Sequence, residues 1–209
     1  MIIYLHGFAS SPASSKVQLL KKSLARQGLA SALWCDQLPV SPAEAIARVE
    51  SVIHAVTAQH VLIGSSLGGY YATYLAEKHG LNAILLNPAT QPFRTLLPRV
   101  GLQTHYQTGE VFEFTSDHLE ELRAFSVPVL SDPSRYWLIV ETGDKVLDYR
   151  DAVAYYAGAR QTVMEGGNHN LQHFPDMLDE IESFALSRSG VSQGLGTCVG
   201  EHRTSTEQP

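Results

Sequence analysis

A glycine–serine turn lies between an apolar run and a segment of helical periodicity, and it restricts the possible folds of this chain more than any other part of the sequence. Residues 61–69 read Val-Leu-Ile-Gly-Ser-Ser-Leu-Gly-Gly, so a run typical of a buried strand meets Gly-x-Ser-x-Gly and passes directly into helical spacing. Only Ser66 has glycines at both minus two and plus two (Gly64 and Gly68), which Ser65 lacks. A turn this tight leaves no room for side chains at the flanking positions and raises the serine hydroxyl above the sheet. The pattern predicts a nucleophile elbow centred on Ser66; the alternative is a glycine-rich turn that matches by chance.

Short apolar runs alternate with segments of helical periodicity along the rest of the chain. The pattern predicts strands at 2–5, 32–35, 60–64, 83–86, 136–140 and 161–164. It predicts helices at 14–27, 42–56, 67–79, 116–123, 148–157 and 175–186. This alternation indicates an α/β fold with a largely parallel sheet of about six strands and helices on both faces.

Chain length and local composition predict a single domain over residues 1–186. The alternation breaks down over residues 89–133, where prolines, glycines and mixed polar and aromatic residues leave only the short helix at 116–123. A long irregular segment between two strands is typical of a lid or binding excursion. Residues 187–209 are rich in Ser, Gly, Thr and charged side chains, which predicts a disordered tail.

Charge and cysteine usage bound the kinds of partner and compartment. The net charge is −6 and no run is rich in lysine or arginine, so nothing favours a nucleic-acid partner. Cys35 and Cys198 form no CxxC or zinc spacing, which fits a reducing compartment. Residues 1–5 lack the basic start of a signal peptide, and no run reaches the about 18 apolar residues of a membrane helix. We expect a cytoplasmic protein without stable membrane insertion.

A serine nucleophile needs a histidine base, and in this kind of elbow the chain order is serine, acid, histidine. His169 ends the run Gly-Gly-Asn-His at 166–169, directly after the last predicted strand. Its two glycines allow the loop to swing the imidazole over the sheet. His173 lies four residues further on, and a metal site built on both histidines would need a third ligand, which the sequence does not offer at a suitable spacing. The order therefore predicts His169 as the base.

The acid is expected where the strand before this histidine ends. Asp144 follows the strand at 136–140 and the pair Thr142-Gly143. Asp148 and Asp151 fall in the predicted helix at 148–157, where a carboxylate caps the helix or faces solvent. Asp144 is the predicted acid and Asp148 the alternative.

Two backbone N–H groups are expected to form an oxyanion hole. One belongs to Leu67, the residue after the nucleophile, and the other to Phe8, in the loop His6-Gly7-Phe8 that follows the first strand. His6 precedes Ser66 in the chain, so the order favours a structural role for it. The predicted chemistry needs no metal and no organic cofactor.

Longer motifs connect the chain to a known family, and they occur in this order: Tyr4-Leu5-His6-Gly7-Phe8 with Ser10-Ser11-Pro12, Gly64 to Thr73, Asn87-Pro88-Ala89, Thr142 to Arg150, Gln161-Thr162-Val163 and Glu165 to His169. With them the chain resembles, over about Met1 to Leu186, the YqiA-type esterases, a small bacterial branch of the α/β-hydrolase superfamily. The resemblance implies a minimal α/β-hydrolase fold that lacks the first two strands of larger members. It also implies hydrolysis of carboxylic esters or thioesters, with short acyl chains or acyl-CoA as substrates.

The expected activity is therefore that of a serine hydrolase acting on a small-molecule acyl ester or thioester through an acyl-enzyme. One alternative is a serine aminopeptidase or amidase, and another is a catalytically silent hydrolase fold that binds ligands. No substrate-binding residue and no oligomeric state is assigned. Five apolar residues of the excursion either line an acyl pocket or only pack over the strand ends: Phe93, Leu96, Leu97, Tyr106 and Phe112.

Overall fold

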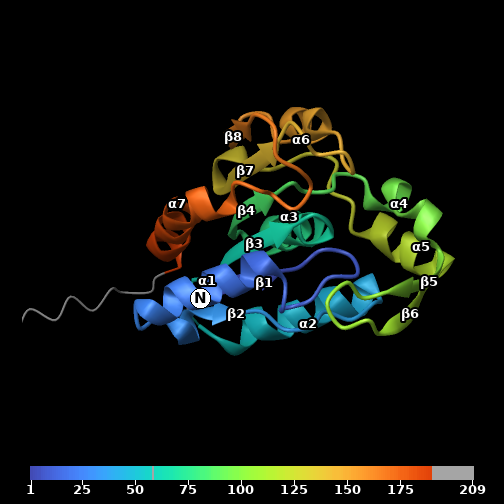
Figure 1. The fold of residues 1–209 in the computed structure, drawn as a ribbon, viewed down its shortest axis with the longest axis horizontal. Helices are drawn as coiled ribbons and strands as arrows, with labels where there is room; N and C mark the ends of the chain where they lie inside the picture. The colour runs from blue at the N-terminus through green and yellow to red at the C-terminus, as the bar shows by residue number, and fades with distance from the viewer. Residues whose placement is uncertain (58, 190–209) are drawn as a thin grey trace, which may run out of the picture.

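Six parallel strands form the centre of the computed structural model, which describes residues 1–57 and 59–189 (Figure 1). They are β1 (Ile2–Leu5), β2 (Leu33–Trp34), β3 (Val61–Ser65), β4 (Asn82–Leu86), β7 (Tyr136–Glu141) and β8 (Arg160–Met164). Their order across the sheet is β2-β1-β3-β4-β7-β8, and every neighbouring pair is parallel. The predicted α/β class and the six-stranded parallel sheet are confirmed.

Helices cover both faces of this sheet, which is why β1, β3 and β7 are buried at every position. Alternate residues of each strand point to opposite faces and so form two separate apolar clusters. The first cluster packs under α2 (Pro42–Ala55), α3 (Leu67–His79) and α6 (Tyr149–Tyr155); the second packs under α1 (Ser15–Arg26) and α7 (Phe174–Arg188). Figure 1 shows these two groups of helices on either side of the strands.

Local signals explain where the helices begin and end. The Ser41 side chain accepts the N–H of Glu44 at 3.2 Å and so caps α2, with Pro42 in its first turn. At the other end α2 stops at Ala55, one residue before Val56, the last residue of the helix predicted at 42–56, which its apolar spacing places on the buried face. Val56 is 40% exposed, so that prediction is wrong, because the residue lies beyond the helix and leaves its face.

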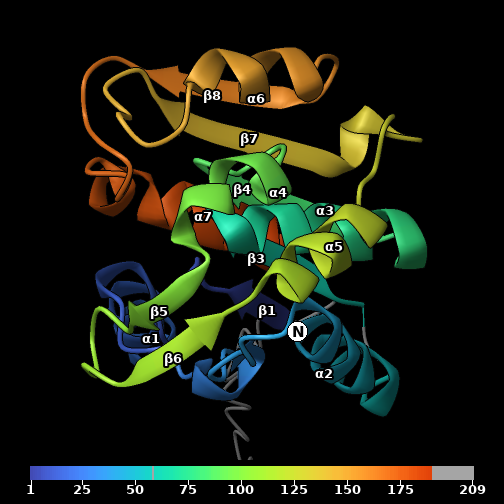
Figure 2. The ribbon, with the colours of Figure 1, turned by 90° about the vertical axis from the view of Figure 1, so that its right-hand side faces the viewer.

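The segment between β4 and β7 is more regular than the sequence predicts. It contains α4 (Pro92–Thr95), an antiparallel hairpin of β5 (Gly101–Thr104) and β6 (Val111–Phe114), and α5 (Ser116–Ala124), besides single 3-10 turns. Of these the sequence predicts only α5. The hairpin escapes prediction because its strands are short and expose large apolar residues, Leu102 at 74% and Val111 at 60%, which destroys the alternation. Figure 2 shows the hairpin standing apart from the main sheet.

This hairpin covers the loop that follows β1. The Phe8 ring packs edge-on against Phe112 and Phe114, with ring centroids 5.7 and 5.0 Å apart. The N–H of Tyr106, in the hairpin connection, donates to the carbonyl of Ala9 at 2.8 Å. The excursion therefore adjoins the predicted oxyanion loop; its role as a lid stays a prediction.

The C-terminal helix α7 continues to Arg188, so it includes the first two residues of the predicted tail. The amino group of Met1 donates to the carbonyls of Gln59 and Ser189, at 2.7 and 3.3 Å, which ties the start of the chain to the end of this helix. The rest of the predicted tail, from 190 onward, lies outside the described residues. In residues 1–57 and 59–189 no helix is long and apolar enough to cross a membrane.

Candidate active site

Ser66 occupies a strained turn between β3 and α3. Its φ of 54° and ψ of −118° lie in a region that residues other than glycine rarely adopt. Hydrogen bonds on both sides hold it there: its N–H donates to the Leu86 carbonyl at 3.0 Å, and its carbonyl accepts from Gly69 at 2.9 Å and Ala89 at 3.1 Å. The neighbouring strand and helix therefore stabilise a backbone conformation that the serine alone would avoid.

The glycines of the motif are required by close backbone approach. A methyl group at Gly64 would overlap the carbonyl of Gly68, and one at Gly68 would overlap the carbonyl of Leu5. At Gly69 a Cβ would stand 2.6 Å from Cβ of Pro88. The first turn of α3 thus lies directly against the ends of β1 and β3, which is the physical reason for this spacing of small residues.

Three predicted residues meet above the carboxyl ends of the strands. His169 Nε2 lies 3.0 Å from Ser66 Oγ, and His169 Nδ1 lies 2.7 Å from Asp144 Oδ2. A carboxylate only accepts hydrogen bonds, so Nδ1 carries the proton and Nε2 is free to accept from the serine hydroxyl. The structure therefore brings Ser66, His169 and Asp144, which are distant in sequence, into one hydrogen-bonded line.

Asp144 is held ionised in this line. Its Oδ1 accepts the N–H groups of Val146 at 2.8 Å and Leu147 at 3.0 Å. Burial of the side chain opposes ionisation, but the hydrogen bond and charge of His169 and the two N–H groups outweigh it. The pKa of the Asp144 carboxyl therefore lies below its ordinary value of 3.8.

The alternative acid, Asp148, has other partners. Its side chain accepts the N–H of Arg150 at 3.0 Å and pairs with the Arg150 guanidinium at 2.7 Å, in an exposed position at the start of α6. It caps the helix there, as its place in the sequence indicates.

Backbone contact between two loops brings the acid and the base together. Gly143 N–H donates to the Gly166 carbonyl at 2.7 Å, and a methyl group at Gly143 would overlap the carbonyls of Gly166 and Gly167. The latter two glycines have φ of 76° and 68°, a left-handed conformation that favours glycine. The loops after β7 and β8 can therefore touch, and they place Asp144 beside His169.

The two predicted oxyanion donors face the same cavity as Ser66 and His169. Leu67 is the first residue of α3, where a backbone N–H has no partner within the helix. Phe8 lines the cavity from the opposite loop, and among the described residues no protein acceptor binds its N–H. Both groups are thus available to a ligand.

His6 supports this loop and takes no part in the hydrogen-bonded line. It is buried, its Nδ1 lies 3.0 Å from the Gly7 carbonyl, and its Nε2 accepts the N–H of Leu38 at 3.0 Å. Burial lowers the pKa of the His6 ring, which favours the neutral form that these two bonds require. Its contacts fit the structural role that the chain order favours.

The cavity over Ser66 measures about 890 Å³ and is cationic in a protein of net charge −6. Its wall includes Lys16, Arg99 and Lys145, and none of its lining residues, all within the described part of the chain, is an aspartate or glutamate. Lys16 is mostly buried and donates to the Asn170 carbonyl at 2.9 Å; burial lowers its pKa to about 8.

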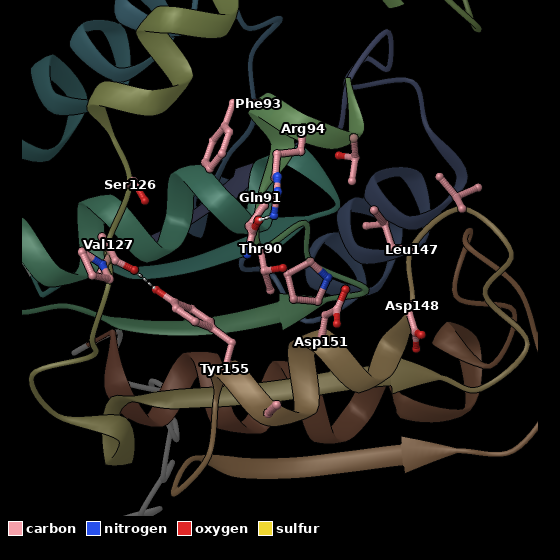
Figure 3. A pocket seen from close by; sticks show the side chains of 15 residues that line it. Thr90, Gln91, Phe93, Arg94, Ser126, Val127, Leu147, Asp148, Asp151 and Tyr155 are labelled. Atoms are coloured by element: carbon pink, nitrogen blue, oxygen red, sulfur yellow. Dashed lines mark hydrogen bonds between the residues drawn. The ribbon is translucent and has the colours of Figure 1, made fainter. Parts of the chain in front are cut away.

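A second cavity, of about 940 Å³, lies between α4 and α6 (Figure 3). It shares Thr95, Val146 and Leu147 with the first cavity but contains neither Ser66 nor His169. In Figure 3 Phe93 and Arg94 lie across from Asp148, Asp151 and Tyr155, whose hydroxyl donates to the Val127 carbonyl at 2.6 Å. Although this cavity is the larger, Ser66 and His169 face the smaller one.

The five apolar residues of the excursion divide between the two sequence interpretations. Leu96 and Tyr106 line the cavity over Ser66, and Phe93 lines the second cavity. Phe112 packs on Phe8, and Leu97 is 61% exposed. Of these five residues, only Leu96 and Tyr106 are placed to contact a group bound at Ser66.

Two charged residues at the site escape prediction from the sequence. Glu141, the last residue of β7, is fully buried and accepts backbone N–H groups from the loop that carries His169. Its only sequence signal is a charged residue at the end of an otherwise apolar strand. Lys16 gives no signal, because one lysine on an amphipathic helix is indistinguishable from a surface residue until the fold is known.

Comparisons with known proteins identify the family and the fold of the chain. The family described as "Uncharacterised protein family (UPF0227)" matches residues 1–186. A monoacylglycerol lipase of Paleococcus ferrophilus superposes with a TM-score of 0.66 at 15% identity, covering 90% of this chain and 94% of the other. Est1E of Butyrivibrio proteoclasticus with bound ferulic acid gives 0.65 at 15%, covering 90% and 88%. An esterase domain of Rhodothermus marinus gives 0.61 at 19%, covering 90% and 87%. Structural similarity of this extent, at 15–19% sequence identity, establishes the α/β-hydrolase fold.

Proposed function

Because the chain belongs to the UPF0227 family, the YqiA-type esterases that its motifs resemble, we propose that it is a serine hydrolase of carboxylic esters or thioesters. The observation that carries this proposal is the hydrogen-bonded line from Asp144 through His169 to Ser66. Its substrates are small acyl esters and thioesters, short-chain esters and acyl-CoA among them. A cytoplasmic location stays a prediction from the cysteines.

In the first half of the reaction Ser66 Oγ attacks the acyl carbonyl carbon while His169 Nε2 takes the hydroxyl proton. Asp144 stabilises the imidazolium that forms and keeps its Nδ1–H directed at the carboxylate. The tetrahedral intermediate then collapses, the bond to the leaving oxygen or sulfur breaks, and His169 Nε2 delivers its proton to that atom. The product of this half is an acyl-enzyme on Ser66.

The second half repeats the chemistry with water. His169 Nε2 takes a proton from a water molecule as its oxygen attacks the acyl carbonyl, and returns that proton to Ser66 Oγ when the free acid leaves. In both halves the N–H groups of Phe8 and Leu67 donate to the negatively charged oxygen, a contribution typically worth about 100- to 1000-fold per donor. The positive end of the α3 dipole points at the same oxygen.

The charge of the cavity favours a substrate with an anionic group. Lys16, Arg99 and Lys145 surround the space in which the leaving group or the acyl chain would lie. An acyl-CoA carries phosphates, so this observation supports it as one member of the class. A serine aminopeptidase would instead need a carboxylate for the substrate amine, and the cavity wall offers cations.

The test compares hydrolysis of p-nitrophenyl butyrate by the wild type, Ser66→Ala and Ser65→Ala. Loss of a triad serine costs about a millionfold in the well-studied case, so Ser66→Ala is expected to fall to background. Ser65→Ala is the matched control, because Ser65 is the adjacent serine without a bond to His169. A fluorophosphonate is expected to label the wild type and Ser65→Ala only. Retention of activity by Ser66→Ala would show that Ser66 is not the nucleophile, and absence of labelling in all three proteins would support a silent fold.

A further inference from the structure

A buried carboxylate lies beneath the loop that carries His169. Glu141 is 0% exposed, and its side chain accepts four hydrogen bonds from residues 168–173. Oε2 accepts the N–H groups of Asn168 at 2.5 Å and Gln172 at 2.9 Å. Oε1 accepts the N–H of His173 at 2.7 Å and lies 2.9 Å from Nδ1 of the same residue. The carboxylate therefore gathers donors from both ends of this loop.

The backbone of residues 168–173 wraps around the Glu141 carboxylate. Its N–H groups converge on one carboxylate, as in the backbone nests that bind anions. Leu171 takes a positive φ of 55°, and its N–H closes the turn on the Asn168 carbonyl at 2.9 Å. A methyl group at Gly167 would overlap the Glu141 carboxylate, so the chain also approaches the anion without a side chain in between. His169 lies inside this wrapped segment.

Charge makes this arrangement strong. Burial raises the pKa of the Glu141 carboxyl, but the backbone N–H groups of His173, Asn168 and Gln172 and the His173 ring outweigh that effect, and the pKa lies below its ordinary value of 4.5. Hydrogen bonds to an ionised acceptor are roughly twice as strong as bonds between neutral groups. The loop is thus fixed by charge-assisted bonds at neutral pH.

A second contact joins the same parts from the carbonyl side of the loop. The Asn87 amide nitrogen donates to the carbonyls of Asn168 and His169, at 3.0 and 3.3 Å, while its oxygen accepts the N–H of Glu141 at 3.0 Å. Asn87 thus donates to carbonyl groups of the loop, and the Glu141 carboxylate accepts from N–H groups of the same loop. Together they connect the end of β7 to the segment that carries the imidazole.

We propose that Glu141 is a positioning residue that holds the loop at 168–173 so that the His169 imidazole stays between Ser66 and Asp144. The inference rests on the proposed function. Glu141 bonds to none of the three reacting side chains and acts through the backbone of Asn168 and His173. A displacement of about 1 Å in a catalytic group costs on the order of 100-fold in rate, which is the scale on which such a support matters.

Three variants remove the support in steps: His173→Ala deletes one hydrogen bond, Glu141→Gln deletes the charge, and Glu141→Ala deletes all four bonds. On p-nitrophenyl butyrate we expect kcat to fall severalfold, about 10-fold and about 100-fold in that order, with KM nearly unchanged. Proton NMR of each protein is expected to show the low-field resonance of the His169 Nδ1–H broadened or shifted in the same order. This resonance needs no substrate, so it tests the inference even if the proposed esterase activity fails.

Glu182→Gln is the matched control, since Glu182 is a buried carboxylate of α7 that accepts from Gln27 at 2.6 Å. It is expected to lower the melting temperature while kcat and the low-field resonance stay at wild-type values. Folded Glu141 variants with wild-type kcat and resonance would overturn the inference. If neither Glu141 variant folds, His173→Ala decides, because its side chain is 38% exposed and its loss is tolerated more easily; wild-type kcat and resonance in that variant would overturn the inference too.

Discussion

Asp144 Oδ2 lies 2.7 Å from His169 Nδ1, and the other oxygen of the same carboxylate is held by two backbone N–H groups. The carboxylate therefore cannot rotate away from the imidazole without losing those bonds. Its fixed orientation selects the histidine tautomer in which Nε2 can accept from Ser66. The position of one carboxylate thus determines which ring nitrogen of His169 carries the proton.

Asp144→Asn is expected to lower kcat by about 10,000-fold, because an amide can donate to Nδ1 and so stabilise the wrong tautomer. The measurement is kcat on p-nitrophenyl butyrate together with a circular dichroism spectrum that shows a folded variant. Asp148→Asn is the matched control: it alters a helix cap worth about 1 kcal/mol and leaves kcat near the wild-type value. The opposite result would assign the acid to Asp148.

Stability is expected to depend on the Asp144 charge at acid pH. The pKa of this carboxyl is lower in the folded protein than its ordinary value of 3.8. Its contribution is therefore fully present above the unfolded value and is lost as the pH falls through the lower, folded value. Melting temperatures of the wild type and Asp144→Asn, measured from about pH 6 to about pH 3, should converge on acidification. A difference that stays constant over this range would contradict the lowered pKa.

Gly68→Ala is expected to disrupt the elbow, because the added methyl group would overlap the Leu5 carbonyl, which is backbone and cannot swing away. Overpacking of this kind costs roughly 1–3 kcal/mol or more, and it displaces Ser66. We expect a lower melting temperature and loss of fluorophosphonate labelling. Gly109→Ala is the control: its φ of 72° is also positive but the added methyl group meets open space, so only a cost of about 1–2 kcal/mol and full labelling are expected. Normal labelling of Gly68→Ala would refute the close approach.

The cationic cavity predicts a preference for anionic esters, measured as kcat/KM for p-nitrophenyl hemisuccinate relative to p-nitrophenyl butyrate. Arg99→Gln and Lys145→Gln are each expected to reduce this ratio by about two- to fivefold, the scale of exposed ion pairs, and added salt should do the same. Lys16, with a pKa of about 8, loses its charge as the pH rises through that value, which lowers the ratio further.

The control for this prediction is Arg94→Gln. Arg94 is a cation that lines the second cavity, so its loss is expected to leave the ratio of the two kcat/KM values unchanged. A matched pair of esters with the negative group on the alcohol side shows which half of the substrate contacts the cations. Equal ratios in all variants would mean that the charge of the cavity plays no part in recognition, and would leave the proposed hydrolysis itself untouched.

Much of the architecture was predictable because its signals are local. A strand covered on both faces must be apolar over most of its length, so β1, β3, β4 and β7 are visible as short apolar runs. The order serine, acid, histidine then predicts Ser66, Asp144 and His169 without knowledge of distances, since each must follow a strand that ends at the same edge of the sheet. The β5–β6 hairpin was not predictable, because its strands are stabilised by contacts with distant residues such as Phe8 and carry no periodic pattern of their own.

The parallel α/β sheet, the glycines of the elbow and the identity of the residues that meet at Ser66 therefore follow from local patterns in the chain. The position of Lys16 at the cavity over this serine and that of Glu141 beneath the His169 loop follow only from the folded arrangement. Burial of an apolar strand and the tightness of a turn restrict residue type position by position, whereas a buried charge is stabilised by partners far along the chain. Those partners, backbone N–H groups and carbonyls, are present at almost every residue, so no residue type marks them in advance.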